Sequence, residues 1–547
     1  MLSVTLAFCL VLFCYLFYLH VIYANHGLDL TDESYHFFLL NIENVNYPNM
    51  VYGSLLNKIS NSFLCNIYNL RIATLIIHIF CGFVLAHTIC LFYRFEKKSL
   101  NSFYFLFIAF SPLTMSGAQG RILSYNSITF CLTCIIISTF LVSEKSKKTF
   151  ISNLFLTFCA IVSGVQFGVK FPHSIMVFGF IILFLICKAS IFKLLLFSTF
   201  WIIGALLVHN SHDVASIFRS FSETIGECGY DSFYGSNSFL DLYTNSIFVQ
   251  FTHFFTKFDI IVVFLLLLFS KKNTVNYIFC SLLLFVYLLY RSLNSGFLQS
   301  GEEASYFMAT PWFLAIMSLV VFTTFAFLRK RILFSRDQLF LMVVLFILPC
   351  LCSLGTNTSL LKQFPIYLSF SSALIVILLA KLPKSHGSFL IPLYLMTTTF
   401  CISFDSLLRN PVRITQPLPQ ISNIPKNSVA GKICLDDTSE NVTLTINSFI
   451  KSNCQAGSNL PYIDIAGCPG TYLFLENKRN CPYYGKWLNT TSLARLEGIF
   501  TNLKNSSNRS VILHSRNKAI LDNFGYFETY VEITELNSII GLFIINS

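Results

Sequence analysis

The sequence predicts a mainly α, polytopic membrane protein of about thirteen transmembrane helices, followed by an extracytoplasmic domain of mixed α/β type. Of the 547 residues, 54% are hydrophobic and only 12% are charged, whereas soluble chains are typically about 45–50% apolar and about 25% charged. The mean hydropathy is +0.66. Long apolar runs fill the chain up to about residue 404, after which the composition becomes polar. Soluble globular, fibrous and disordered proteins are therefore excluded.

The membrane part is predicted from the length of its apolar runs. A helix needs about 20 apolar residues to cross the hydrocarbon core of a bilayer. The first run has no basic residues before it and is long for a signal peptide, so we expect it to be retained as a helix. The expected spans are 3–24, 70–93, 101–118, 125–143, 150–169, 173–188, 190–209, 258–270, 274–293, 306–328, 338–354, 363–381 and 388–404.

The placement of the basic residues predicts the orientation of these helices. When thirteen helices are threaded in order, every basic cluster falls on the same side, and Lys and Arg are enriched in cytoplasmic loops. We therefore expect the N-terminus in the cytoplasm, with the loops 25–69 and 210–257 and the C-terminal domain outside. The clusters are Arg94/Lys97/Lys98, Lys145/Lys147/Lys148, Lys188/Lys193, Lys271/Lys272, Arg329/Lys330/Arg331/Arg336 and Lys381/Lys384.

Residues 405–547 are predicted to form a separate extracytoplasmic domain next to a membrane domain at 1–404. Pro, Asn, Asp, Ser and Gly become frequent there, and β-branched or alternating stretches at 510–514, 530–534 and 539–545 favour strands. Four cysteines would face an oxidising compartment, so one or two disulfides are expected, with the pairing left open. These cysteines are Cys434, Cys454, Cys468 and Cys481.

Several common enzyme motifs are absent from the sequence. It has no phosphate-binding loop, no dinucleotide-binding glycine motif, no zinc-protease motif and no metal knuckle. The cytoplasmic loops are also too short to fold a nucleotide-binding domain. Any enzymatic activity must therefore lie in the membrane or on its outer face, where a substrate has to arrive already activated. A lipid-linked substrate meets this requirement, and no nucleic-acid partner is expected.

A cluster of acidic residues directly follows the first helix. Asp29, Asp32 and Glu33 lie with His36 at the membrane edge, where a carboxylate is costly unless it is paired or hydrated. One interpretation is a short interfacial helix that Thr31 or Asp29 caps, with the acids favouring the positive end of its dipole. The other is catalytic: glycosyl transfer to a hydroxyl needs a base, and fixed cations must stabilise a departing lipid phosphate.

The position of Asp32-Glu33 resembles the acidic signature of GT-C glycosyltransferases, which are multi-spanning enzymes that use polyprenyl-phosphate sugars. The protein mannosyltransferases and the lipid A aminoarabinose transferases are branches of this superfamily. Further stretches resemble a bacterial branch of it, and together they extend over most of the chain. They are Arg121-Ile-Leu-Ser-Tyr125-Asn126, Lys170-Phe-Pro172, Gly355-Thr-Asn357, Asn410-Pro-Val-Arg413 and Asp464-Ile-Ala-Gly467-Cys-Pro469-Gly470.

The resemblance implies a GT-C-like membrane fold and a polyprenyl-phosphate-linked sugar donor. The acceptor would be a hydroxyl of a lipid, a glycan or a protein. One acid of the first loop would be the catalytic base: Asp32 or Glu33, with Asp29 as a further candidate. His36 would orient a carboxylate or the acceptor, and the alternative is a histidine whose hydrogen bonds are simply satisfied at the interface.

The few basic residues on the outer side are candidates for binding the donor phosphate. Arg121 stands before the fourth helix with Tyr125 nearby, Lys170 lies in a short turn, and Lys58 lies in the first loop. A lipid phosphate carries its negative charge at this depth, and Arg and Lys are its usual partners. The alternative for each is that the side chain reaches outward to lipid headgroups.

A metal cofactor is not predicted, although some GT-C enzymes depend on a divalent cation. The loop 210–257 is rich in potential ligands, but their spacing fits no known ligand pattern. We interpret it as a solvated loop that faces the acceptor. The residues concerned are His209, His212, Asp213, Glu223, Glu227, Cys228, Tyr230 and Asp231.

The sequence thus predicts a glycosyltransferase of the cell envelope, in a bacterial inner (plasma) membrane. The alternative is a polytopic transporter, flippase or polysaccharide polymerase without this chemistry. Transporters usually carry charges near the bilayer midplane and helices broken in paired halves. Here the charges lie at the outer edge and no half-repeat is evident, which favours the enzyme.

Overall fold

The computed structural model describes about three fifths of the chain, in two compact units. The first unit comprises Met1–Ile22, Ile72–Val208 and Ser238–Val412, and the second comprises Tyr23–Arg71, His209–Asn237 and Arg413–Ser547. The described residues are 2–28, 30, 33–34, 36–37, 66–93, 98–113, 121–209, 301–328, 334–353, 364–381, 389–408, 411, 414, 416–421, 426–428, 431–453, 462–464, 469–474, 483–485, 510–515, 527–533 and 540–545.

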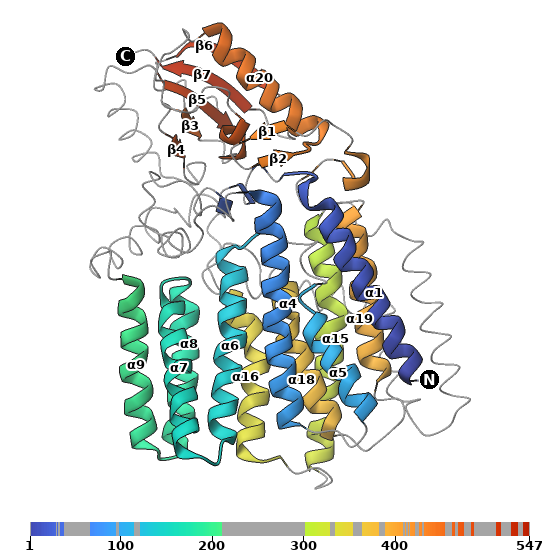
Figure 1. The fold of residues 1–547 in the computed structure, drawn as a ribbon, viewed down its shortest axis with the longest axis vertical. Helices are drawn as coiled ribbons and strands as arrows, with labels where there is room; N and C mark the ends of the chain where they lie inside the picture. The colour runs from blue at the N-terminus through green and yellow to red at the C-terminus, as the bar shows by residue number, and fades with distance from the viewer. Residues whose placement is uncertain are drawn as a thin grey trace. The chain divides into compact units, whose positions relative to one another are not determined.

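The first unit is a bundle of helices that run side by side (Figure 1). Five of its described helices are long and apolar enough to cross a membrane. Its described helices coincide with eleven of the predicted spans, whereas 258–270 and 274–293 lie outside the described residues. They are α1 (Leu2–Ile22), α4 (Ile67–Phe92), α5 (Lys98–Phe110), α6 (Tyr125–Lys145), α7 (Thr149–Phe167), α8 (Phe171–Cys187), α9 (Ile191–His209), α15 (Gly301–Leu328), α16 (Arg336–Ser353), α18 (Leu368–Lys381) and α19 (Leu390–Leu408).

Local sequence explains where several of these helices begin and end. The side chain of Ser124 caps α6 by accepting a hydrogen bond from the Ser127 amide at 3.2 Å. Pro172 lies in the first turn of α8, where its missing amide costs no hydrogen bond. The expected span 101–118 is wrong at its end, because α5 stops at Phe110. Pro112 follows closely and disfavours helical geometry in the residue before it.

An ion-pair network joins one end of the bundle. Lys188, which follows α8, lies 2.8 Å from Glu144 at the end of α6 and 3.0 Å from Asp337 at the start of α16. Lys193 in α9 contacts Glu144 at 2.8 Å. Four helix ends that adjoin basic clusters therefore meet at one end of the bundle, as threading the helices in order requires. The assignment of this end to the cytoplasm stays a prediction.

Glycines allow two helices of the first unit to approach closely. A Cβ atom on Gly164 of α7 would lie 2.1 Å from the carbonyl oxygen of Trp201, and one on Gly204 of α9 would lie 2.3 Å from that of Ile161. Small residues that bring backbones together are a general device of membrane helix packing. The α7–α9 pair therefore depends on these two positions.

The described residues of the second unit include a mixed sheet and the long helix α20. The sheet has the strand order β4-β3-β5-β7-β6; β3 is parallel to β4 and β5, and β7 is antiparallel to β5 and β6. The last three strands coincide with those that the sequence predicts. The elements are β1 (Lys426–Ser428), β2 (Gly431–Ile433), α20 (Asp437–Asn453), β3 (Tyr462–Asp464), β4 (Tyr483–Gly485), β5 (Ser510–Ser515), β6 (Phe527–Ile533) and β7 (Ile540–Ile545) (Figure 1).

The second unit groups residues of the first loop with the C-terminal residues, and the domain boundary expected at residue 404 stays a prediction. The sequence assigns the loop 25–69 to the membrane domain, whereas the second unit joins Tyr23–Arg71 to the C-terminal residues. Composition could not indicate this, because backbone hydrogen bonds make the connection. Of the four C-terminal cysteines only Cys434 is described, as a buried free thiol, so the expected disulfides stay a prediction.

Candidate functional site

The chain turns sharply at the end of α1, and the C-terminal residues hold this turn. After a short 3-10 helix at Tyr23–Asn25, Gly27 adopts a φ of +63°, which favours glycine. The Gly27 amide donates to the Cys434 carbonyl at 2.8 Å, and the Cys434 amide donates to the Asn25 carbonyl at 3.0 Å. The acidic segment therefore starts from a fixed backbone position.

Arg71 binds the acidic segment through every N–H group of its guanidinium. It lies in the first turns of α4 and forms a bidentate ion pair with Glu33, with Nε–Oε1 at 2.7 Å and Nη2–Oε2 at 2.6 Å. Its remaining hydrogens go to the carbonyls of Ala24 at 2.7 Å, His26 at 3.3 Å and Gly27 at 2.7 Å. Both charged side chains are buried. An arginine has five such donors in a rigid fork, so this one is fully used.

Arg71 is not among the site residues that the sequence predicts, although its position carries a signal. Arg71 is a lone basic residue at the beginning of the long apolar run 70–93, where a charge needs a partner. Its position is fixed because the Asn66 side chain caps α4 by accepting from the Tyr68 amide at 2.9 Å. The pairing with Glu33 required knowing how the chain returns after α1.

The ion pair changes what Glu33 can contribute. Both of its carboxylate oxygens accept hydrogen bonds from Arg71. A carboxylate held in this way anchors the loop. It is also a weak base, because the positive charge of the arginine stabilises its ionised form. Asp32 and Asp29, the other two candidates for the base, lie outside the described residues. The geometry around Glu33 therefore suits an anchor of the loop better than a catalytic base.

His36 lies in the same segment and is buried. Burial lowers the pKa of its imidazole to about 4, and the nearby charge of Glu33 opposes this shift only in part. His36 is thus neutral at neutral pH. It can orient a neighbouring group by hydrogen bonding but supplies no positive charge to a phosphate.

Lys170 lies in the first unit, in the turn between α7 and α8. It is only 5% exposed. Its ammonium donates a hydrogen bond to Asn126 Oδ1 at 2.8 Å and another to the carbonyl of Cys352, and it lies 5.3 Å from the centre of the Tyr125 ring, within cation–π range. Two of the phosphate-site residues expected from the sequence, Lys170 and Tyr125, are thus in contact.

Further buried polar groups surround this lysine. Tyr367 donates to the Cys352 carbonyl at 3.0 Å, Thr133 and His173 Nε2 lie 2.9 Å apart, and the Gln166 amide donates to Thr133 at 2.8 Å. We call this group the Lys170 cluster. It consists of Asn126, Thr133, Gln166, Lys170, His173, Cys352 and Tyr367, which are all buried.

The charge of Lys170 has no carboxylate partner among the residues that the structure describes. Burial accordingly lowers the pKa of its ammonium to about 7, because a buried charge is costly when nothing opposite compensates it. An ammonium has three N–H groups, and two of them are engaged by residues that the structure describes. A bound anion would satisfy both the third donor and the charge.

The structure says less about Arg121 and Lys58, the other two basic residues predicted to bind the phosphate. Arg121 is half-buried in the segment that leads into α6 and interacts electrostatically with His20 near the end of α1. Lys58 lies outside the described residues. Within the second unit the structure brings Glu33 and His36 together, and within the first it brings Lys170 and Tyr125 together.

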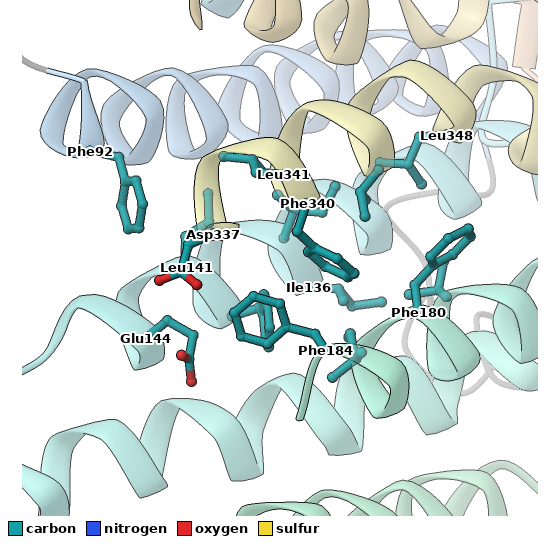
Figure 2. Close-up of a pocket in the computed structure, with 15 residues that line it drawn as sticks. Phe92, Ile136, Leu141, Glu144, Phe180, Phe184, Asp337, Phe340, Leu341 and Leu348 are labelled. Carbon is teal, nitrogen blue, oxygen red and sulfur yellow. The ribbon is translucent and has the colours of Figure 1, made fainter. Parts of the chain in front are cut away.

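An apolar pocket lies between α6, α8 and α16 in the first unit (Figure 2). Its empty space, including the part open to the surroundings, is about 640 Å³. The rings of Phe184 and Phe340 meet inside it, with centroids 4.7 Å apart. The carboxylates of Glu144 and Asp337 lie on one side of it (Figure 2), at the ion-pair network. The wall is otherwise apolar, which suits a hydrocarbon chain.

The same three helices that line the pocket also carry members of the Lys170 cluster. Each of the three helices carries a pocket-lining residue four positions, or about one turn, from a member of the cluster. The three lining residues are Ile137, Val177 and Leu348, and the corresponding cluster members are Thr133, His173 and Cys352.

Metal ligands are not grouped within the described part of the chain: no three His, Cys, Asp or Glu residues there lie close enough together to hold an ion. The loop 210–257, which contains the potential ligands noted in the sequence, lies outside it. A dependence on a divalent cation is therefore untested.

No protein-family model and no curated protein matches the chain. A search of solved structures finds the crystal structure of ArnT from Cupriavidus metallidurans bound to undecaprenyl phosphate, with a TM-score of 0.42 and 8% sequence identity over 99% of this chain and 97% of that one. These values are too low to assign an activity or a site to this protein.

Proposed function

We propose that the protein is an integral-membrane glycosyltransferase of the GT-C type. It would transfer a sugar from a polyprenyl-phosphate donor to an acceptor hydroxyl of a glycolipid, polysaccharide or protein on the outer face of the membrane. The observation that carries this proposal is Lys170, a buried ammonium with a spare hydrogen-bond donor and no carboxylate partner among the described residues. A lipid phosphate is an anion that lies at the membrane edge, where the sequence places Lys170.

The proposed reaction assigns separate tasks to the two candidate groups. The acceptor oxygen attacks the anomeric carbon of the sugar, and its proton passes to the carboxylate of Asp32. The bond between the anomeric carbon and the phosphate oxygen breaks, and the polyprenyl phosphate leaves with the electron pair. Lys170 stabilises the charge of this phosphate. Arg71 holds the first loop through Glu33 and three carbonyls, which preorganises the segment that carries the base.

The apolar pocket supports a donor that is linked to a lipid. Its three helices also contribute Thr133, His173 and Cys352 to the Lys170 cluster, so a ligand that binds Lys170 could extend an apolar chain along α6, α8 and α16. Cys352 and Asp337 are 15 positions apart in α16, so a lipid chain that follows the helix from one to the other covers about 22 Å. The pocket would thus bury the first isoprene units of the donor.

Replacing Lys170 by glutamine should weaken the binding of undecaprenyl phosphate about 10- to 100-fold. Hydrogen bonds to charged groups contribute about 1.5–3 kcal/mol, and about 1.4 kcal/mol corresponds to a tenfold change in affinity. The measurement is equilibrium binding to the purified full chain in detergent micelles. Undecaprenol, which has no phosphate, should bind wild type and K170Q equally.

A matched control is Lys148→Gln, because Lys148 is exposed and its side chain makes no capping hydrogen bond at the start of α7. This variant should bind undecaprenyl phosphate as the wild type does. If the wild-type protein does not bind undecaprenyl phosphate, or if K170Q binds it with wild-type affinity, the proposed donor site is wrong. Transport would then be the better interpretation.

The affinity for undecaprenyl phosphate should fall as the pH rises from 7 to 9. Burial lowers the pKa of Lys170 to about 7 in the free protein, and only the charged form below this pKa attracts phosphate. Each further pH unit removes up to about a factor of ten in affinity, until the higher pKa of the bound state is reached. The charge of the phosphate itself changes little over this range, because the second ionisation of a phosphate monoester has a pKa of about 6.

Lys170→Arg provides the control for this pH dependence, since an arginine stays charged throughout. Its affinity, whatever its absolute value, should change little between pH 7 and 9. A wild-type profile as flat as that of K170R would contradict the proposal that Lys170 is the group that titrates.

A further inference from the structure

We propose that the C-terminal part of the chain positions the acidic first-loop segment, and that Gly470 is the residue through which it does so. The Gly470 amide donates a hydrogen bond to the carbonyl of Leu30 at 2.8 Å. Leu30 precedes Asp32 by two residues. This inference rests on the proposed function, in which an aspartate of that segment is the base.

The packing at Gly470 leaves no room for a side chain. A Cβ atom there would lie 2.4 Å from Ser34 Oγ, 2.7 Å from Leu30 Cα and 2.7 Å from Leu30 Cδ2. Ser34 directly follows Glu33. The glycine therefore touches the segment on both sides of the Asp32-Glu33 pair, and one of these contacts is with backbone that cannot rotate away.

The turn that carries Gly470 is itself fixed. It spans Pro469–Phe474 as a short 3-10 helix, in which Thr471 and Leu473 are completely buried. The side chain of Asn447 in α20 donates to the carbonyl of Phe474 at 3.1 Å. A path of direct contacts therefore runs from α20 through this turn to Leu30.

Among the described residues, three attachments therefore hold the segment that follows α1. Cys434 pairs with the backbone at Asn25 and Gly27, Gly470 binds Leu30, and Arg71 binds Glu33. Two of the three come from the C-terminal part. This gives a role to the Pro469-Gly470 motif, which the donor site does not use. The C-terminal part is thus a scaffold of the catalytic segment, and Gly470 acts on the base through Leu30 and Ser34.

The test is Gly470→Ala in the full-length protein, with hydrogen exchange and kinetics measured on the same sample. Amide exchange should become faster in the peptide that covers 23–37 and stay unchanged in α6, α7 and α8, which shows that the bundle still folds. The kcat for sugar transfer should fall about a hundredfold, as expected for a base displaced by about 1 Å. The donor KM and the affinity for undecaprenyl phosphate should stay within twofold, because Lys170 is not part of this unit.

Two further variants keep the inference testable. Asn447→Leu loosens the turn without adding a Cβ clash, so it should change exchange and kcat in the same direction but by less. Gly179→Ala is the matched control, because a Cβ at that glycine of α8 meets nothing within 4 Å.

Transfer is assayed as the release of undecaprenyl phosphate from undecaprenyl-phosphate hexoses and pentoses, with cell membranes as the source of acceptor. An active wild type whose G470A variant keeps wild-type exchange and kcat would overturn the inference and leave the proposed function intact. If no donor of the panel is turned over, the proposed function fails. Unchanged exchange at 23–37 in G470A would even then refute the positioning role.

Discussion

Replacing Arg71 by alanine should destabilise the second unit by about 3–5 kcal/mol, the usual cost of removing one partner of a buried ion pair. Glu33 would be left as a buried charge, and the carbonyls of Ala24, His26 and Gly27 would lose their donor. Thermal unfolding in detergent micelles should shift to lower temperature, and amide exchange at 23–37 should accelerate.

Conservative variants separate the parts of this interaction. Arg71→Lys keeps the charge but loses the fork that reaches four partners, so it should be nearly as harmful as R71A. Glu33→Gln should cost less than R71A, because Arg71 keeps its three carbonyl contacts and the amide oxygen can still accept a bond. Wild-type stability of R71A would show that the ion pair does not hold the segment.

Replacing Asp32 by asparagine should reduce kcat about 10²- to 10⁴-fold, the range expected when a general base is lost. Binding of undecaprenyl phosphate should stay within twofold, because the base makes no contact with the phosphate in the proposed reaction. The assay is the same release of undecaprenyl phosphate from lipid-linked hexoses and pentoses.

The neighbouring acids serve as controls for this assignment. Asp29→Asn should lower kcat by less than tenfold, and Glu33→Gln should lower it only as far as it loosens the segment in hydrogen exchange. A hundredfold loss in D29N with an active D32N would move the base to Asp29. An unchanged exchange pattern in an inactive E33Q would make Glu33 the base, against the geometry seen here.

Most of the helical bundle follows directly from the sequence. Apolar runs of about 20 residues have few alternatives to helices, and the described helices coincide with eleven of these runs. The end of α5 shows the limit of this approach, because hydropathy alone extends the helix past Pro112. The strands β5, β6 and β7 were predictable for a similar reason, since alternating and β-branched residues mark them.

The candidate site was predictable only in part. Lys170 stands out because basic residues are scarce on its side of the bundle, but its partners Asn126 and Cys352 are 44 and 182 residues away in the chain. The contact between Gly470 and Leu30 likewise depends on tertiary structure, since nothing local in either stretch requires the other. Glu33 stands out in the sequence as a carboxylate at the membrane edge, but its partner Arg71 gives it the geometry of an anchor.

The proposal is tested most directly by an experimental structure of the full chain with undecaprenyl phosphate bound. We expect a phosphate oxygen at about 2.7–2.9 Å from the ammonium of Lys170, the usual length of a charge-assisted hydrogen bond. The first isoprene units should occupy the pocket between α6, α8 and α16. A phosphate bound elsewhere, with Lys170 still joined only to Asn126 and Cys352, would contradict the proposed donor site.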